Sequence, residues 1–245
     1  MSELHAVVTG ASSGIGAAAV RRLTAEGWRV TAVARRQERL AALQAETGCA
    51  VIVADITSAA DVARLAQAVT GPVHALVNNA GGAVGWVTIA QSSPDDWLSQ
   101  YALNVVGTVR VTQALLPHLI DSGRGDVINL TSTAGHEPYE YGAGYVAAKH
   151  AEAAMTRTLR LELTGTGVRV MEIAPGMVHT EEFSLHRFDG DQSKADAVYQ
   201  GIEPLTAQDI ADAAFYALSR PHHVSMDLMV IRPREQGGAT KTVRR

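Results

Sequence analysis

The chain has 245 residues, of which 47% are apolar and 5% aromatic, and its formal net charge is −4. This length and composition suit one domain whose core of alanine, valine, leucine and isoleucine needs no disulfide and no metal. A small acidic excess without clustered basic and aromatic residues argues against a nucleic-acid partner.

The single cysteine and the first residues both indicate a cytoplasmic protein. Cys49 cannot form an internal disulfide, which suits a reducing compartment, and we expect it in the core. The N-terminus runs directly into an apolar strand pattern and lacks the basic segment and long apolar run of a signal peptide. No apolar run is long enough to cross a membrane, so we expect a soluble protein.

Short apolar runs rich in β-branched residues alternate with helical patterns along the chain. The expected strands are Leu4–Thr9, Arg29–Ala34, Ala50–Ala54, His74–Asn78, Asp126–Thr131, Arg169–Ile173 and Asp227–Ile231. The expected helices are Gly14–Glu26, Gln37–Glu46, Ser58–Val69, Pro94–Leu119, Gly144–Leu163 and Thr206–Ser219. This alternation predicts a single-domain α/β fold over residues 1–245. Its doubly wound parallel (Rossmann) sheet has seven strands in the order 3-2-1-4-5-6-7, with helices on both faces.

Two segments depart from the alternation. Residues 181–204 are polar and irregular with one weak helical patch, and we interpret them as a mobile lid over a substrate site. Residues 234–245 follow the last strand and are expected to be a frayed terminus. Neither segment, nor any repeat or linker, divides the chain into two domains.

The loop Thr9-Gly-Ala-Ser-Ser-Gly-Ile-Gly16 leaves the first strand and opens the first helix. Its glycines allow a tight turn and let a pyrophosphate approach the backbone, while the helix N-terminus supplies free N–H groups and a positive dipole end. The position and the spacing favour a dinucleotide site over a turn without a ligand.

The end of the second strand indicates which dinucleotide is bound. An acidic residue there would bind the adenosine ribose of NAD, but this chain has Arg35 and Arg36, and its next carboxylate is Glu38. Two guanidinium groups suit a 2′-phosphate, so we predict NADP(H). The alternative is that both arginines begin a solvated helix. Asp55 either accepts a hydrogen bond from adenine or caps the following turn.

Polar and small side chains follow the fourth and fifth strands. Asn78-Asn79-Ala80-Gly81 leaves room for a flat ring beside the sheet, and Ser132 lies near the carboxyl edge, where ligands bind in such sheets. Asn104 falls inside a long helical pattern, where it is either a tolerated polar position or the mark of a local distortion near a site.

Tyr145 and Lys149 lie four residues apart in an alanine-rich helical run, so their side chains project from the same helix face. A fixed positive charge beside a phenol favours the phenolate, which would make Tyr145 an acid/base group at neutral pH. Taken alone, this pair is common on ordinary amphipathic helices, and only the other motifs give it weight.

Together these motifs resemble the short-chain dehydrogenase/reductase family in its compact form of about 250 residues. The resemblance covers residues 4–232 and includes Pro175-Gly-Met-Val-His-Thr180, which looks like the family's segment facing the nicotinamide. The segments 216–223 and 231–233 resemble a narrower group. It includes clavulanic aldehyde reductase and bacterial NADP-dependent 3-hydroxy acid dehydrogenases.

The resemblance implies four catalytic residues. Tyr145 would exchange a proton with the carbonyl oxygen, Ser132 would hydrogen-bond that oxygen, Lys149 would bind the nicotinamide ribose, and Asn104 would hold a water that links Lys149 to solvent. The cofactor residues that it implies are Gly10, Ser12, Ser13, Ile15, Gly16, Arg35, Arg36, Asp55, Ile56, Asn79, Ala80, Gly81, Tyr145, Lys149, Pro175, Gly176, Val178 and Thr180. No metal site is expected.

The sequence therefore predicts a carbonyl reductase or alcohol dehydrogenase with a small-molecule substrate. A catalytically silent NADP(H) sensor is the main alternative, but it should have lost one of the four catalytic residues. An isomerase or dehydratase should have a longer chain. Residues 82–86, 133–141 and 177–204 should line the substrate pocket, although a solvated lid is expected for the basic residues of the last segment. By resemblance, a homodimer or homotetramer would form through Pro94–Leu119 and Gly144–Leu163.

Overall fold

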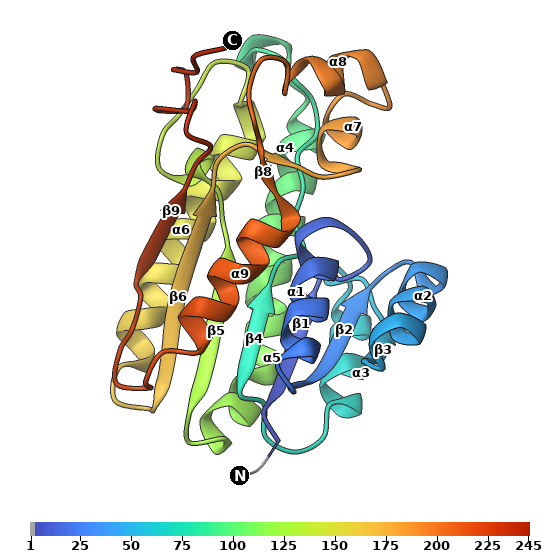
Figure 1. Ribbon diagram of the computed structural model, residues 1–245, viewed down its shortest axis with the longest axis vertical. Helices are drawn as coiled ribbons and strands as arrows, with labels where there is room; N and C mark the ends of the chain where they lie inside the picture. The colour runs from blue at the N-terminus through green and yellow to red at the C-terminus, as the bar shows by residue number, and fades with distance from the viewer. Residues whose placement is uncertain (1–2) are drawn as a thin grey trace.

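The computed structural model describes residues 3–245, and a seven-stranded parallel sheet forms its centre (Figure 1). The strands are β1 (His5–Thr9), β2 (Arg29–Ala34), β3 (Ala50–Val53), β4 (Ala75–Asn78), β5 (Gly125–Leu130), β6 (Val168–Pro175) and β9 (Leu228–Ile231). Their order is β3-β2-β1-β4-β5-β6-β9, and every neighbouring pair is parallel. The predicted fold class and strand order are confirmed.

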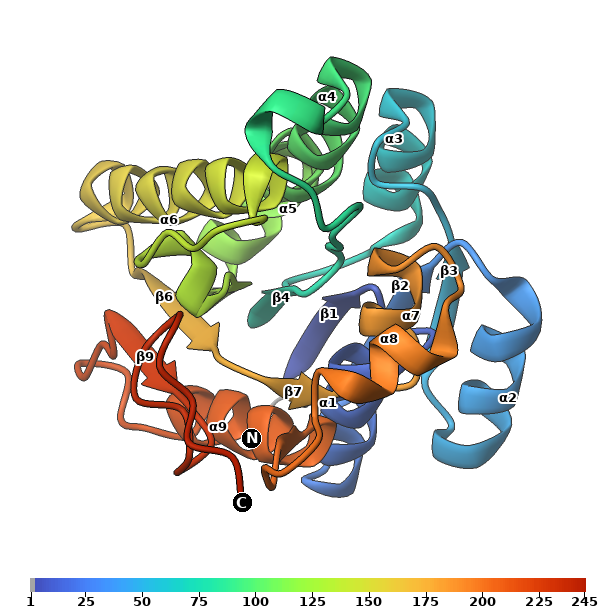
Figure 2. The same cartoon turned by 90° about the horizontal axis from the view of Figure 1, so that it is seen from above.

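Helices cover both faces of the sheet (Figure 2). The helices α1 (Gly14–Ala25), α2 (Gln37–Thr47) and α9 (Ala207–Leu218) enclose one apolar core with the sheet. On the opposite face, α3 (Ala59–Ala68), α5 (Thr108–Asp121) and α6 (Ala143–Leu163) enclose the second core. Because both faces are covered, central strands such as β1 and β5 are buried along their whole length.

Local sequence fixes where several of these helices begin. The Ser58 hydroxyl accepts a hydrogen bond from the Asp61 N–H at the start of α3. At the start of α9, Thr206 and Asp209 form a reciprocal capping box. These caps satisfy backbone N–H groups that have no partner inside the helix, and they fix how the chain enters each helix.

The expected helix Pro94–Leu119 is not continuous, and this prediction is wrong. It consists of α4 (Pro94–Tyr101), a π-helical segment (Ala102–Gly107) and α5. The Asn104 side chain donates to the Gln100 carbonyl at 2.8 Å, the acceptor that the Asn104 backbone N–H would use in a regular α-helix. The side chain therefore competes with the helix for this carbonyl, and the alternative of a local distortion at Asn104 is the correct one.

The lid segment has more structure than its sequence indicates. Two short helices, α7 (Phe183–Arg187) and α8 (Gln192–Ala197), replace the single weak helical patch. The strands β7 (Val178–His179) and β8 (Leu205–Thr206) pair with each other and close the base of the lid. Above the carboxyl ends of the strands, the lid lies beside the C-terminal tail (Figure 1).

The tail, expected from the sequence to be a frayed terminus over residues 234–245, packs against the lid in the structure. The Gln236 side chain is only 8% exposed, and its Oε1 accepts a hydrogen bond from the Met177 N–H at 2.9 Å. Near the end of the chain, Arg244 donates to the Val198 carbonyl at 3.2 Å, and the Arg245 N–H donates to the Gly201 carbonyl. A polar composition suggested disorder, but these side chains satisfy backbone groups of the lid.

Within residues 3–245, no helix combines the length and apolarity that a membrane crossing requires. The same residues contain no group of three or more histidine, cysteine or acidic side chains arranged to hold a metal ion. Cys49 is buried and unpaired.

Candidate active site

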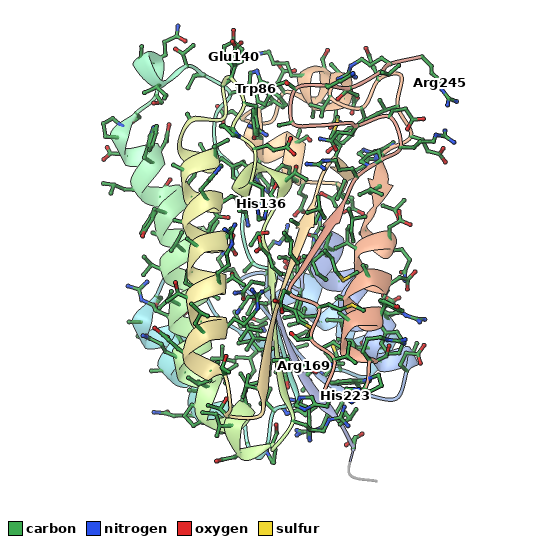
Figure 3. The ribbon with its side chains drawn as sticks, turned by 90° about the vertical axis from the view of Figure 1, so that its left-hand side faces the viewer. Trp86, His136, Glu140, Arg169, His223 and Arg245 are labelled. Carbon is green, nitrogen blue, oxygen red and sulfur yellow. The ribbon has the colours of Figure 1, made fainter. Side chains whose placement is uncertain are left out.

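The carboxyl ends of the parallel strands meet at one edge of the sheet, where a cavity of about 860 Å³ opens beneath the lid. In Figure 3 Trp86, which lines this cavity, lies at the upper end of the molecule, opposite Arg169 and His223. The predicted site residues that line it are Gly10, Ser13, Ile15, Asn79, Ala80, Gly81, Ser132, Tyr145, Lys149, Pro175, Gly176, Val178 and Thr180.

The other predicted site residues lie outside the lining of this cavity. They are Ser12, Gly16, Arg35, Arg36, Asp55, Ile56 and Asn104. Six of them belong to the segments that follow β1, β2 and β3, and Asn104 belongs to the π-helical segment.

The glycine-rich loop is packed tightly against the end of β4. The Asn79 side chain donates to the Thr9 carbonyl at 2.9 Å, and the Thr9 hydroxyl accepts from the N–H groups of Asn79 and Ala80. A Cβ atom at Gly16 would overlap the carbonyl oxygen of Gly10, so only glycine fits there. This packing holds the N-terminus of α1 open toward the cavity.

Arg36 lies over this loop and Arg35 does not. The Arg36 guanidinium donates to the hydroxyls of Ser12 at 2.8 Å and Ser13 at 2.9 Å, and it forms an ion pair with Glu182 of the lid. Ser13 also donates to Glu182 at 2.8 Å. These hydrogen bonds lower the pKa of Glu182 to about 2, so its carboxylate is charged at every working pH. Glu182, which belongs to the segment expected to be a mobile lid, is therefore fixed to the glycine-rich loop.

Asp55 caps the turn that follows β3. Its Oδ1 accepts from the Thr57 N–H at 2.8 Å and from the Thr57 hydroxyl at 2.7 Å. Its Oδ2 lies 3.9 Å from the Arg35 guanidinium, which is 72% exposed. Ile56 is buried in the second core, where it contacts the π-helical segment at Gly107. Of the two roles considered for Asp55, the structure shows the cap.

Ser132 and Tyr145 both line the cavity, from different elements. Ser132 follows β5, and its hydroxyl accepts from the Ala134 N–H at 3.1 Å, which fixes the turn and holds the hydroxyl at the strand end. Tyr145 lies in the first turn of α6, is almost fully buried, and contacts the Phe183 ring of the lid edge to face. A polar group reaching both hydroxyls would lie in a largely apolar enclosure.

Lys149 lies one turn after Tyr145 on α6, and it is buried. Its Nζ donates to the Leu130 carbonyl at 3.0 Å and to the Glu152 carboxylate at 2.6 Å. Burial opposes the charge of this ammonium group, but Glu152 and Tyr145 outweigh burial and raise the pKa of Lys149. An ammonium group has three donors, so one remains for a further acceptor.

Asn104 approaches Lys149 across Gly81. Its Nδ2 donates to the Gly82 carbonyl at 3.0 Å, and its Oδ1 accepts from the Gly82 N–H at 3.1 Å. A Cβ at Gly81 would lie 2.7 Å from the Asn104 Oδ1 and 3.4 Å from the Lys149 Nζ. The π-helical segment therefore positions Asn104 against the strand-end loop beside Lys149.

The cavity also contains the guanidinium group of Arg187, one of the basic lid residues that were expected to be solvated. Arg187 of α7 lies over the Trp86 ring at 4.3 Å and 5.6 Å from the Tyr145 ring centroid, and it donates to the Tyr139 hydroxyl at 2.9 Å. Its Nε is buried without a hydrogen-bond partner among residues 3–245. No local pattern in the polar lid marks this residue, because its position depends on how α7 packs over the sheet.

Comparison with known proteins now identifies the family. Residues 4–187 match the family model described as short chain dehydrogenase. The chain belongs to this family. An uncharacterised oxidoreductase of Mycobacterium tuberculosis (strain ATCC 25618 / H37Rv) is 55% identical over 96% of this chain and 93% of its own length. The sulfoacetaldehyde reductase of Chromohalobacter salexigens is 41% identical over 94% of this chain and 93% of its own length.

A solved structure agrees with this assignment. The closed form of a serine dehydrogenase complexed with NADP+ superposes with a TM-score of 0.93 at 36% identity, covering 99% of this chain and all of that one. The family assignment that the sequence motifs predicted is therefore confirmed, and the relatives are oxidoreductases and dehydrogenases.

Proposed function

We propose that this protein is an NADP(H)-dependent oxidoreductase that interconverts the carbonyl and alcohol forms of a small anionic substrate. The observation that carries the proposal is the arrangement of Ser132, Tyr145 and Lys149 around one cavity that also contains the Arg187 guanidinium. The first three residues suit proton exchange with a carbonyl oxygen, and Arg187 suits an anion.

The residues around the glycine-rich loop fit a dinucleotide. No acidic residue occurs in the first turn of α1, and the Ser13 side chain donates to Glu182 instead of capping the helix. The helix N-terminus can therefore receive a pyrophosphate. Arg35 and Arg36 follow β2 and would bind the 2′-phosphate. The dehydrogenase neighbour solved with NADP+ supports the same choice.

The nicotinamide supplies or accepts the hydride when it is bound. Tyr145 would protonate the carbonyl oxygen during reduction and take the proton back during oxidation. Ser132 would donate a hydrogen bond to the same oxygen as charge develops on it. The remaining Lys149 donor would bind a ribose hydroxyl, and its positive charge would stabilise the phenolate of Tyr145. Asn104 would hold a water beside Lys149.

Arg187 supports an anionic substrate. The substrates in the names of two relatives, sulfoacetaldehyde and serine, carry a sulfonate and a carboxylate. The flat guanidinium is stacked on Trp86 and bonded to Tyr139, so its orientation is fixed while its buried Nε has no partner. An anionic group two or three atoms from the carbonyl would complete this site.

We also propose that the protein is a cytoplasmic homodimer or homotetramer. Large apolar side chains are exposed on α4 at Leu98 and Tyr101, on α5 at Ile120 and on α6 at Leu161, the helices expected from the family to form contacts. No partner is proposed among nucleic acids or membranes.

The test is a cofactor-oxidation screen with matched substrate pairs. NADPH and NADH are each offered with sulfoacetaldehyde against acetaldehyde, and with 3-keto acids against their methyl esters. We expect turnover with NADPH on the anionic member of a pair, at least 100-fold lower in Tyr145→Phe because the phenol supplies the proton. Arg187→Leu should raise KM for the anionic member about 10-fold or more and leave the neutral member unchanged.

Other outcomes of the screen exclude parts of the proposal. Tight NADPH binding without turnover on any substrate would favour the sensor alternative. Equal losses on charged and neutral substrates in Arg187→Leu would mean that Arg187 only supports the lid. Lys194→Leu is a suitable control, because Lys194 also lines the cavity from the lid.

A further inference from the structure

A second group of ionisable side chains is buried behind Tyr145 and Lys149. Glu152 lies on α6 one turn after Lys149, is 1% exposed, and pairs with the Lys149 Nζ at 2.6 Å. Glu172 of β6 is equally buried. Neither carboxylate lines the cavity, so neither belongs to the substrate site already described.

Glu172 connects this group to the surface. Its Oε1 accepts from the Thr131 hydroxyl at 2.7 Å and lies 2.7 Å from the His136 Nε2. The other ring nitrogen of His136 lies 3.4 Å from the exposed Arg157 guanidinium. Figure 3 shows His136 below Trp86, between the cavity end of the molecule and Arg169.

The charges in this group do not balance unless one more proton is present. Two ionised carboxylates against one ammonium would leave a net negative charge in a dry interior, which is costly. Burial raises the pKa of Glu152 to about 7, against the effect of Lys149 and with a contribution from Glu172. Glu152 therefore carries an extra proton below about pH 7, and the group changes charge near neutral pH.

Few other groups face Glu152 in the part of the chain that the structure describes. From α6 itself these are Lys149 and, beyond it, Tyr145, and from β6 there is Glu172. The turn after β5 supplies His136, with Arg157 behind it, and β5 supplies only neutral hydroxyl and amide groups. Asn104 in the π-helical segment is also neutral.

We propose that Glu152 is a positioning residue that acts as the counter-ion of Lys149 and sets how strongly the Lys149 charge acts on Tyr145. When Glu152 is ionised it offsets the ammonium group, and the phenol retains its proton more firmly. When Glu152 is protonated, the ammonium charge acts on Tyr145 without this offset. The consequence for turnover rests on the proposed function, whereas the coupling of charges does not.

The coupling can be measured in the protein without cofactor. Tyrosinate absorbance is followed against pH, and the same titration with Tyr145→Phe added is subtracted to isolate Tyr145. Glu152→Gln keeps the size of the side chain and an oxygen acceptor for Lys149, but removes the charge. We expect the Tyr145 midpoint to fall by about one pH unit, the size expected for a unit charge removed from a partly dry site. Glu162→Gln, exposed on the same helix, should leave it unchanged.

Two results would overturn the proposal. An unchanged midpoint in a folded Glu152→Gln variant would make Glu152 a structural residue only. A higher midpoint would mean that Glu152 acts only by keeping Lys149 protonated. If Glu152→Gln does not fold, Glu172→Gln serves as the second variant, with a shift in the same direction but smaller; no shift there overturns the proposal as well.

Turnover separates this proposal from the proposed function. In alcohol oxidation, the acidic limb of the kcat profile should move with the Tyr145 midpoint, while KM changes little. A shifted midpoint in a protein that turns over no substrate would refute the proposed function and leave the coupling in place. Turnover with an unshifted Tyr145 midpoint would support the proposed function and refute the coupling.

Discussion

Two adjacent arginines at the end of β2 have different surroundings, and this difference gives a test of cofactor choice. Arg36 is held by two hydroxyls and Glu182, whereas the Arg35 guanidinium lies 3.9 Å from Asp55 and is largely exposed to solvent. The donors of Arg35 are therefore available to a phosphate.

We expect Arg35→Asp to raise the dissociation constant for NADPH by roughly 10- to 100-fold, because a charge-assisted hydrogen bond is lost and a like charge is introduced. The constant for NADH should change by less than about 3-fold, since NADH has no 2′-phosphate. Fluorescence titration of both cofactors measures this. Arg64→Asp, the same change on exposed α3, is the control; equal effects on both cofactors would contradict the assignment of Arg35.

For single residues of the site, the sequence was informative where their position depends on local spacing along the chain. Tyr145 and Lys149 share a helix face because they are four residues apart, and Ser132 is at a strand end because β5 stops there. Glu152 follows Lys149 by only three residues, but its burial and the nearby charge of Glu172 on β6 depend on the folded chain, so its spacing alone did not single it out. Arg187 was expected among the solvated basic residues of the lid, because its contacts with Trp86 and Tyr139 also form only in the folded chain.

At the scale of elements, the lid is fixed at both ends rather than free. Glu182 joins its first residues to Ser13 and Arg36, and Arg244 of the tail donates to carbonyls at the end of α8. The sequence indicated a polar, irregular segment, whereas the structure contains two short helices there. The sequence could not reveal these contacts, since they join residues more than forty positions apart.

We expect Glu182→Gln to loosen the lid. The change weakens a partly exposed charged contact by about 1 kcal/mol, which corresponds to roughly 5-fold faster proteolytic cleavage within residues 181–204 in the cofactor-free protein. The pKa of Glu182 is lowered to about 2, so its contribution is present above the usual carboxylate range and is lost only as the pH falls through that low value.

The difference between the two proteins should therefore be constant from about pH 6 to pH 9. Glu181→Gln is the matched control, because the Glu181 carboxylate is exposed and lies 3.2 Å from Arg39. Faster cleavage in both variants would mean that the total charge of the lid, rather than the Glu182 contact, holds it closed.

At the scale of the whole molecule, the two ends of the parallel strands have different roles. The carboxyl ends of the strands hold the cavity. At the opposite ends, where Figure 3 labels Arg169, buried polar contacts include the bidentate pair of Arg169 and Asp126, at 2.6 and 2.7 Å. The fold class and strand order followed from apolar periodicity, because a parallel sheet needs both faces buried. The polar contacts at the amino ends of the strands could not be predicted from apolar periodicity, since they depend on strand register.

His5, at the amino end of β1, makes the stability of the whole fold sensitive to acid. His5 is 1% exposed, and its Nε2 lies 2.9 Å from the Thr31 hydroxyl. The backbone N–H of His5 donates to the His74 Nδ1, and this nitrogen must be unprotonated to accept. Burial, together with the charge of Arg29, lowers the pKa of His5 to about 4. Between the ordinary histidine value near 6.5 and this value, the unfolded chain binds a proton that the folded chain does not.

Stability should therefore be unaffected by His5 above about pH 6.5 and should fall as the pH drops toward 4. We expect a loss of about 2 kcal/mol from this side chain between about pH 7 and pH 4.5. In His5→Gln this part of the loss should disappear, because glutamine can still bond Thr31 and does not titrate. Urea unfolding at several pH values measures the slope, with the exposed His223→Gln as control. Parallel curves for His5→Gln and the unchanged protein would assign the acid sensitivity to other groups, of which His74, whose pKa burial also lowers, is the first to test.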